Sequence, residues 1–243
     1  MFRLLIAVSF TLALASLCFF AASCGSSGQA QARVVQAISD AQVGLDVKVN
    51  TTTPFTNLAF GTVQPTPPAY TKVPSGTVTL QAVDTGTSTL VIQNTNATFN
   101  GSSQYTVLMT GFSNNSGTTA PTFWNITDNN TAPTAGNVEF RIINASTNSV
   151  LQDAGKLDIY IVQPGQGLGS ATVSGLSFGQ ASAYIPENYN GAQGYQIYVC
   201  PPGGNQNCYF NNNSAPPTGA IRTLVIVDSG NFISNFLVLN DLG

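Results

Sequence analysis

The feature that most constrains this chain is an internal repeat. Short segments of the first half recur in the second half, in the same order and 108 to 118 residues further along. Val34–Ala37 matches Ile142–Ala145, and Gly44–Val49 matches Lys156–Ile161. Repeats of this length indicate one structural unit used twice, because a unit of about 100 residues is a usual size for a domain. The second copy is expected to carry the longer loops.

Within each unit, the apolar residues follow the two-residue period of half-buried β-strands. Leu45–Val49 and Val78–Val83 alternate apolar and polar residues, whereas Tyr105–Met109 and Leu224–Val227 are dense apolar runs typical of central strands. No convincing 3.6-residue apolar stripe follows residue 24. The expected fold class is therefore all-β: two tandem immunoglobulin-like, or related, antiparallel β-sandwich domains of about seven strands each, following a signal peptide.

The repeat and the changes in composition along the chain place the domain boundaries. We expect a lipoprotein signal peptide at 1–23, a flexible tether at 24–31, a first sandwich at 32–130, a linker at 131–136 and a second sandwich at 137–243. A linker this short limits the reach of one domain relative to the other.

The N-terminus has the composition of a bacterial export signal. One positive charge, Arg3, precedes a stretch from 4 to 22 that is almost entirely apolar, and small residues lead up to Cys24. This segment resembles the lipobox of bacterial lipoproteins, with Ala21 where that motif usually has Leu. The resemblance implies cleavage before Cys24 and a lipid on its thiol, which anchors the protein to a membrane. The alternatives are an uncleaved transmembrane anchor and a plain secreted protein.

A lipoprotein of this kind is expected in the bacterial cell envelope. Gly25 stands where inner-membrane lipoproteins typically carry Asp, so the outer membrane of a Gram-negative cell is favoured. The 7 basic residues, no two of them adjacent, cannot form the patch that nucleic-acid binding requires. The formal net charge is −3 and only 7% of residues are charged, so we expect recognition through neutral polar and aromatic groups.

Two cysteines, Cys200 and Cys208, follow the predicted lipidation residue. An oxidising compartment is expected to join them in a structural disulfide, with redox chemistry as the less favoured alternative. Their spacing alone does not make a zinc site, and the chain contains no His to complete one. No metal and no other cofactor is expected.

One segment resembles a catalytic motif. Gly175–Gly179 fits the G-x-S-x-G nucleophile elbow, which would make Ser177 the nucleophile of a hydrolase. The chain has no His to act as the base, and the matched residue of the first unit is Ala59. A strand that leads into a turn is the simpler interpretation, so no catalytic residue is assigned and the protein is not expected to be an enzyme.

Two further patterns involve carboxylates. Lys156 and Asp158 fall on one face of a predicted strand, where a solvated cross-strand pair is simpler than a catalytic one. Asp46 and Asp158 recur at matched positions of the repeat, either as calcium ligands or as polar strand-face residues and turn acceptors. Calcium requires six to eight oxygen ligands, and the ten acidic residues do not cluster in the sequence, so the second interpretation is favoured.

The repeated segments together resemble a bacterial family called domain of unknown function 4397. The resemblance rests on Val35–Ala41, Leu45–Val49, Leu58–Gly61 and Val73–Gly76 of the first unit. Ile38 interrupts the first of these stretches, and the second unit lacks the V-P-x-G turn. The resemblance covers nearly all of the chain after the leader and implies two tandem copies of an exported, often lipid-anchored β domain. It implies no known activity and no catalytic residues.

Aromatic residues gather in the second unit and provide a candidate binding surface. We assign to it Tyr189, Tyr195, Tyr209 and Phe210, because tyrosines on loops form neutral contact surfaces. The preferred hypothesis is a lipid-anchored envelope protein without catalytic activity that binds or adheres to a protein or glycan at the cell surface. The alternatives are a purely structural envelope spacer and, less favoured, the hydrolase using Ser177.

Overall fold

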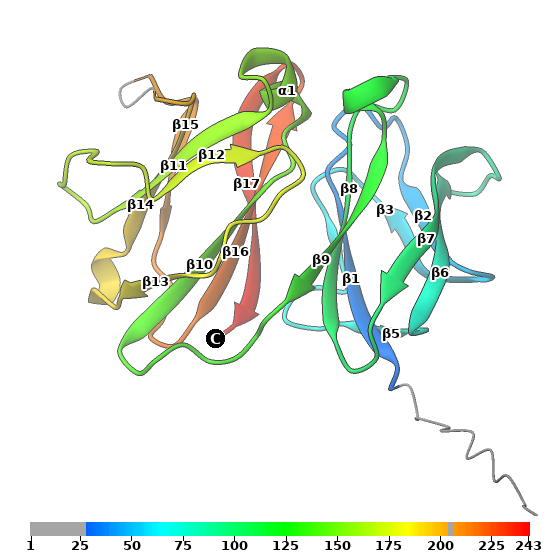
Figure 1. Ribbon diagram of the computed structural model, residues 1–243, viewed down its shortest axis with the longest axis horizontal. Coiled ribbons are helices and arrows are strands. Elements are labelled where there is room, and N and C mark those ends of the chain that lie inside the picture. The colour runs from blue at the N-terminus through cyan, green and yellow to red at the C-terminus, as the bar shows by residue number, and fades with distance from the viewer. Residues whose placement is uncertain (1–27, 204–206) are drawn as a thin grey trace, which may run out of the picture.

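The computed structural model describes residues 28–203 and 207–243, which form two β-sandwiches packed side by side (Figure 1). The predicted signal peptide at 1–23 and the lipidation residue Cys24 lie outside the described residues, as do the first residues of the predicted tether. The all-β fold class is confirmed. Within the described residues, no helix has the length and apolar composition needed to cross a membrane.

The first sandwich consists of two sheets. One has the strand order β4-β1-β8-β9, with β5 also paired to β1, and the other has the order β3-β2-β6-β7. The first strand begins at Ala30, inside the segment predicted as tether. The elements are β1 (Ala30–Gln36), β2 (Leu45–Val49), β3 (Thr52–Leu58), β4 (Val63–Gln64), β5 (Thr71–Val73), β6 (Gly76–Asp84), β7 (Leu90–Phe99), β8 (Gln104–Thr110), the 3₁₀ helix η1 (Gly117–Thr119) and β9 (Thr122–Asp128).

The second sandwich repeats this plan with sheets of four strands each. One sheet has the order β13-β10-β16-β17, and the other has the order β12-β11-β14-β15. The elements are β10 (Asn137–Asn144), α1 (Thr147–Gln152), β11 (Lys156–Val162), β12 (Val173–Ser177), β13 (Ile185–Asn188), the 3₁₀ helix η2 (Gly191–Gln193), β14 (Tyr195–Cys200), β15 (Phe210–Ser214), β16 (Ile221–Ser229) and β17 (Phe232–Leu242). The short helix α1 is absent from the sequence prediction, because six residues are too few to display a 3.6-residue stripe.

Each sandwich contains one parallel pair among its antiparallel strands. β1 runs parallel to β8, with Arg33 opposite Thr106, and β10 runs parallel to β16, with Arg141 opposite Thr223. The apolar pattern of the sequence does not reveal which strands pair in parallel, because side chains alternate with a period of two in parallel and antiparallel sheets alike. The matching registers show that the two sandwiches are built alike.

The four sheets stack in order, so that the two inner sheets are covered on both faces (Figure 1). One apolar core fills each sandwich, and a third joins the inner sheets, β4-β1-β8-β9 and β13-β10-β16-β17. We call this interface between the inner sheets the seam. β8 and β16 are buried at nearly every position, whereas β2 alternates buried and half-buried residues. Double coverage therefore explains the dense apolar runs, since a strand buried on both faces needs apolar residues throughout.

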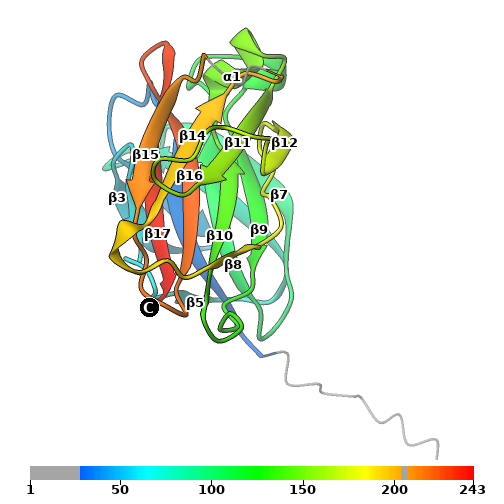
Figure 2. The same cartoon turned by 90° about the vertical axis from the view of Figure 1, so that its left-hand side faces the viewer.

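The described chain enters at one end of the molecule, and several loops gather at the opposite end. β1 starts where the chain enters, whereas α1 and the turn between β16 and β17 lie at the far end (Figures 1 and 2). The parallel registers of β1 with β8 and of β10 with β16 bring the ends of these strands to the same side. We call this side the distal end; its loops are residues 38–44, 85–89, 111–121, 145–155 and 229–231.

Candidate functional site

A buried cluster of four charged side chains lies in the seam. Arg33 of β1 contacts Asp241 of β17 at 2.6 Å (Nη1 to Oδ1) and Asp128 of β9 at 3.3 Å (Nη2 to Oδ2). Arg141 of β10 contacts Asp128 at 2.8 Å and Asp241 at 4.0 Å through its Nη2. Each arginine thus pairs with the aspartate of the other sandwich as well as with the aspartate of its own.

The surroundings of the two arginines are also equivalent. The arginine of the first sandwich donates from Nε to Thr106 Oγ1 at 2.9 Å, and its counterpart donates to Thr223 Oγ1 at 3.0 Å. A tyrosine ring lies against each guanidinium, with the ring centre of Tyr70 at 5.1 Å and that of Tyr184 at 5.0 Å. Reciprocal contacts of this kind give the seam an approximate two-fold symmetry.

Burial and charge act in opposite directions on this cluster. Burial disfavours the charged guanidinium of Arg33, but the carboxylates of Asp241 and Asp128 outweigh burial and raise its pKa. Burial, reinforced by Asp128, raises the pKa of Tyr70, so this phenol stays protonated. The Nη atoms of Arg33 meet the carboxylates as ion pairs without hydrogen-bond alignment. Because its charged side chains are almost completely buried, the cluster holds the sandwiches together and does not face a substrate.

On one side of the seam, Trp124 of β9 packs against the apolar core between the inner sheets. Its ring lies so close to Gly179 that a β-carbon on this glycine would come within 1.6 Å of the ring. Phe178 meets the same ring edge to face, with ring centroids 5.6 Å apart. Gly179 also has a φ of +72°, which side chains disfavour. Glycine is therefore required at this turn both by the backbone conformation and by the approach of the indole.

The equivalent contact on the other side of the seam is much looser. The strand registers place Leu237 of β17 at the position that Trp124 occupies on β9. A β-carbon on Gly61, the counterpart of Gly179, would lie 3.7 Å from the Leu237 side chain. A hollow of about 360 Å³ opens here, and we call it the Leu237 hollow. Besides Gly61, its lining includes the apolar residues Phe60, Val227 and Leu237 and the polar residues Ser229, Ser234 and Asn235.

The distal end exposes large apolar side chains of both sandwiches. They are Val43 and Leu90 in the first sandwich and Leu151 and Phe232 in the second. Phe232 has 72% of its surface exposed, and Leu151 has 64%. A single exposed apolar residue is common in soluble proteins, but several gathered at one end favour a contact surface.

A second hollow lies among the distal loops of the first sandwich. Its volume is about 290 Å³, and its lining combines the carboxylates of Asp40 and Asp84 with Val43 and Leu90. One of these carboxylates is already used, because Asp40 Oδ1 accepts a hydrogen bond from the backbone N–H of Ser113 at 2.8 Å. The hollow adds a mildly acidic rim to the exposed apolar residues of the distal end.

The helix α1 of the distal end is held by a buried carboxylate. Asp228 Oδ1 accepts a hydrogen bond from Ser146 Oγ at 2.5 Å, and its Oδ2 accepts one from the Asn148 backbone N–H at 3.1 Å. Burial raises the pKa of Asp228, and these hydrogen bonds oppose the shift. By strand register, the first sandwich has Gly111 at this position. The first sandwich has loop 38–44 in place of the helix, so the capping carboxylate belongs to the second sandwich alone.

A third hollow, of about 420 Å³, lies beside the start of β1 and is lined by amides and hydroxyls. Several of these amides already bond one another. Asn130 Nδ2 donates to Gln104 Oε1 at 3.1 Å, and Gln104 Nε2 donates to Gln31 Oε1 at 3.2 Å. The polar groups of this hollow thus serve the local structure, which leaves the distal end and the Leu237 hollow as the stronger candidate sites.

Two of the four aromatic residues predicted as a binding surface belong to the core. Tyr195 is 2% exposed and packs edge to face against Phe140, so its assignment to a surface is wrong. Phe210 is half-buried on the same core, with its ring edge to face against Phe236. Both residues sit in strands whose inward-pointing positions fill the sandwich, which the clustering of aromatic letters in the sequence does not reveal.

The other two predicted aromatic residues lie at opposite ends of the second sandwich. Tyr189 is 42% exposed, and its backbone N–H donates to Gly136 in the predicted linker. Tyr209 is half-buried, and its hydroxyl donates to Asp153, which follows α1 at the distal end. The fold therefore does not bring the four predicted residues together, and the single aromatic surface is a wrong prediction.

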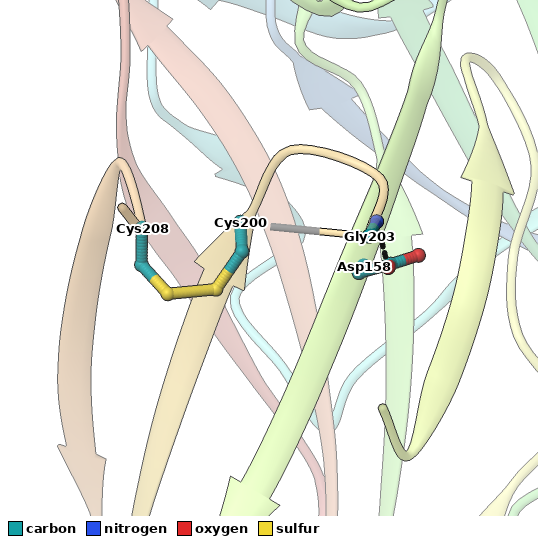
Figure 3. The surroundings of a disulfide bond; sticks show 4 residues. All are labelled: Asp158, Cys200, Gly203 and Cys208. Atoms are coloured by element: carbon teal, nitrogen blue, oxygen red, sulfur yellow. Dashed lines mark hydrogen bonds between the residues drawn. A yellow bond between two sulfur atoms is a disulfide. The ribbon is translucent and has the colours of Figure 1, made fainter. Parts of the chain in front are cut away.

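Cys200 and Cys208 form the predicted disulfide, with an S–S distance of 1.96 Å (Figure 3). The bond joins the end of β14 to the segment that leads into β15. Asp158 of β11 accepts a hydrogen bond from the Gly203 N–H at 2.8 Å, which ties the segment directly after Cys200 to the neighbouring strand (Figure 3). Because the disulfide links two adjacent strands, its position agrees with a structural role.

The carboxylates that recur in the repeat accept hydrogen bonds from nearby turns. Asp158 Oδ1 accepts one from the Gly175 N–H at 2.7 Å, and Asp46 Oδ1 accepts one from the Asn57 N–H at 2.8 Å. The latter bond is the main cause that lowers the pKa of Asp46. Asp158 is 4% exposed, so the solvated pair with Lys156 is wrong. Across 28–203 and 207–243, no three His, Cys, Asp or Glu side chains are grouped to hold a metal ion.

Ser177 does not stand on a nucleophile elbow. It is the last residue of β12 and lies opposite Lys156 of β11. The residues that follow form a turn and an isolated bridge at Ala181, whereas the elbow requires a helix after the nucleophile. The glycine that completed the apparent motif, Gly179, is explained by its contact with Trp124.

The sequence analysis missed the buried charged cluster of the seam. Arg33 and Arg141 occupy matched positions, 108 residues apart, inside strands that are otherwise strongly apolar. In a chain with 7 basic residues, two that repeat in this way indicate buried charges, which need acidic partners. The partners Asp128 and Asp241 each follow an apolar run near the end of a unit, so a signal existed for all four.

Comparison with known protein families agrees with the resemblance seen in the repeated segments. No curated protein is significantly similar in sequence to this chain. Residues 30–151 match the family described as Domain of unknown function (DUF4397), and this range covers half of the chain. It includes the whole first sandwich, β10 and most of α1. The chain therefore belongs to the DUF4397 family.

Proposed function

We propose that this protein is a lipid-anchored binding protein of the bacterial cell envelope, without catalytic activity, whose distal end contacts a partner. The observation that carries the proposal is the placement of the two ends of the molecule. The described chain enters at one end, and α1 and the turn between β16 and β17 lie at the other (Figure 2). The exposed side chains of Leu151, in α1, and Phe232, at the start of β17, belong to this distal end. A lipid on Cys24 would hold the first end towards the outer membrane, so the distal end would face away from it.

The composition of the distal end favours a protein over a glycan as the partner. Phe232 and Leu151 are large apolar groups of the kind that anchor protein interfaces in buried pockets. The nearby carboxylates of Asp40 and Asp84 add a polar, acidic rim. A glycan would instead call for a dense set of hydrogen-bonding groups, and the hollow that offers such groups lies at the other end, where they bond one another.

A binding screen on peptide and glycan arrays tests the proposal. The full-length protein in detergent would be compared with the double variant Leu151→Ser/Phe232→Ser and with Val238→Ser. Val238 is 47% exposed but lies within β17, outside the distal end, and serves as the matched control. We expect saturable binding to peptide probes that weakens at least tenfold in the double variant and is unchanged in the control. Lack of saturable binding on both arrays would contradict the proposal.

The anchor is tested separately by the intact mass of the protein from its native membranes. We expect a chain that starts at Cys24 and carries acyl groups. A mass that retains residues 1–23 would overturn the lipoprotein part of the proposal and make the apolar stretch an uncleaved anchor.

We further propose that residues 137–243 are a second copy of the domain matched in the first half. The equivalent registers of Arg33 and Arg141, and the matching tyrosine over each guanidinium, support this proposal. The family match stops within α1, at residue 151, so the second copy rests on these structural equivalences.

One observation favours the alternative of a purely structural envelope spacer. The buried ion pairs and the apolar core of the seam join the two sandwiches into a stiff unit, as a spacer requires. The array experiment separates the two functions, because a spacer needs no saturable partner and tolerates polar residues at 151 and 232.

A further inference from the structure

We propose that the Leu237 hollow binds a tryptophan side chain supplied by a partner polypeptide. The inference rests on the proposed function and names the chemistry of the partner. Val227 and Ser229 line the hollow from the end of β16, and Ser234 lines it from the start of β17. The exposed Phe232 begins β17 directly after the turn between these strands, so the hollow borders the distal end. It is also continuous with the apolar core of the seam, which includes Phe60 and Leu237.

The other side of the seam shows which group fills such a space. There, the ring of Trp124 lies directly on Gly179 and meets Phe178 edge to face. The Leu237 hollow has the same phenylalanine and glycine, Phe60 and Gly61, in the matched turn. A tryptophan ring is therefore the group that this molecule itself places between such a turn and the neighbouring strand.

The hollow is open because β17 carries Leu237 at the position where β9 carries the larger Trp124. Leu237 ends 3.7 Å from the β-carbon position of Gly61, in ordinary contact, and leaves the rest of the space free. The two turns have nearly the same backbone conformation, with φ of +76° at Gly61 and +72° at Gly179. The volume of about 360 Å³ lies within the roughly 300–1,000 Å³ of typical ligand pockets. The hollow is thus already shaped before any partner arrives.

The rim of the hollow suits an aromatic ring that carries a hydrogen-bond donor. An indole N–H usually finds an acceptor when it is buried. Ser229, Ser234 and Asn235 place hydroxyl and amide oxygens around the apolar lining. The side chain of Asn235 is held in place, because its Oδ1 accepts a hydrogen bond from the Phe236 N–H at 2.8 Å. An aliphatic side chain would make no use of the oxygen acceptors on this rim.

Titration with N-acetyltryptophanamide, followed by saturation-transfer NMR, tests the site. The full-length protein in detergent would be used, with empty micelles as the blank and N-acetylleucinamide as the aliphatic control. We expect saturable, millimolar binding of the tryptophan probe and at least tenfold weaker binding of the leucine probe. Equal binding of both probes, or no saturable binding of either, would overturn the inference.

Three variants localise the binding. Leu237→Trp places the protein's own indole in the hollow and should weaken probe binding at least tenfold without lowering the thermal midpoint of unfolding. Ser229→Phe narrows the rim at an exposed position, so it should weaken binding even if the first variant fails to fold. Val238→Trp adds an indole at the next, exposed residue of β17 and should leave binding unchanged.

These variants also separate the inference from the broader proposal. Probe binding that persists at full strength in both folded Leu237→Trp and Ser229→Phe proteins would place the probe elsewhere and overturn the inference. An array partner that depends on Leu151 and Phe232 but is insensitive to Leu237→Trp would overturn the inference alone. Probe binding that Leu237→Trp abolishes, without any array partner, would support the site and contradict the proposed function.

Discussion

The two sandwiches are equivalent in the charges of the seam but differ in one apolar contact of the seam and in the loops of the distal end. Arg33 and Arg141 pair with the same two aspartates, and each has a tyrosine ring against its guanidinium. In contrast, Trp124 fills its side of the seam, and Leu237 leaves its side open. At the distal end, the first sandwich has a loop where the second has the helix α1.

This comparison separates what holds the molecule together from what it can present to a partner. A buried charge is tolerated only with a paired opposite charge, so a change on one side of the cluster must be matched on the other. Surface loops and rim residues carry no such constraint. The equivalent residues therefore identify the structural frame, and the unequal ones, such as Leu237 and Phe232, identify the candidate contact sites.

Removing one arginine of the buried charged cluster is expected to cause the largest loss of stability. Arg33→Met should lower the free energy of unfolding by about 3–5 kcal/mol, because Asp241 and Asp128 stay buried without their partner. Arg141→Met should have a comparable effect, whereas Lys72→Met, at an exposed site on β5, should have none that is measurable. Urea denaturation gives all three values. A large loss for one arginine and none for the other would refute the two-fold equivalence of the seam.

Alanine substitutions at the matched glycines, Gly61 and Gly179, compare how tightly the two sides of the seam are packed. Gly61→Ala and Gly179→Ala both force alanine into a positive φ, which costs about 1–2 kcal/mol at each site. Gly179→Ala should cost roughly 1–3 kcal/mol more, because its β-carbon collides with Trp124. The extra cost should disappear in a Trp124→Ala background. Equal costs in the wild-type background would show that the indole adapts freely, and would remove the proposed difference between the two sides.

The disulfide tests a feature that only the second sandwich has. By strand register, Val83 is the counterpart of Cys200. The double variant Cys200→Ala/Cys208→Ala should lose about 2–3 kcal/mol of unfolding free energy, because the short loop is no longer closed. Reducing agent should destabilise the wild type by a similar amount and leave the double variant unaffected. If reduction leaves the wild type unchanged, the bond does not stabilise the second sandwich.

The smallest expected effect concerns Asp228, the carboxylate that caps α1. Burial raises its folded-state pKa above the ordinary value of 3.8, so the folded protein favours the protonated form. Relative to the non-titrating variant Asp228→Asn, the wild type should be most stable below pH 3.8 and lose stability as the pH rises through the folded-state pKa. Each unit of pKa shift corresponds to about 1.4 kcal/mol. Denaturation series from pH 3 to pH 8 give this difference, and a difference that grows with pH has the wrong sign for the mechanism.

The sequence was a good guide where local pattern decides the structure. Alternation in segments such as Leu45–Val49 predicts half-buried strands, as observed. The repeat predicts two copies of one domain, and the second copy stays a proposal. The disulfide was predictable because Cys200 and Cys208 are the cysteines that remain after the predicted lipidation site. The signal peptide and Cys24 stay predictions, since they lie outside the described residues.

The candidate sites were much less predictable, because they depend on which faces of the strands meet. Tyr195 and Phe140 stack in the core although their residue types also suit a surface. Nothing in the local sequence around Leu237 reveals that it faces Gly61, which is far away along the chain. Matched arginines could have predicted a buried pair, but not that each arginine would reach the aspartate of the other unit.

The sequence by itself thus determined an all-β chain with a repeated strand pattern, because strand periodicity and repetition can be read directly along the chain. Only the tertiary structure decided that the units pack through their inner sheets. That packing turns Arg33, Asp128, Arg141 and Asp241 into one buried cluster and makes Trp124 and Leu237 unequal counterparts. The physical reason is that the free energy of this seam comes from pairing of charges and filling of space between residues distant in the chain, which no local pattern encodes.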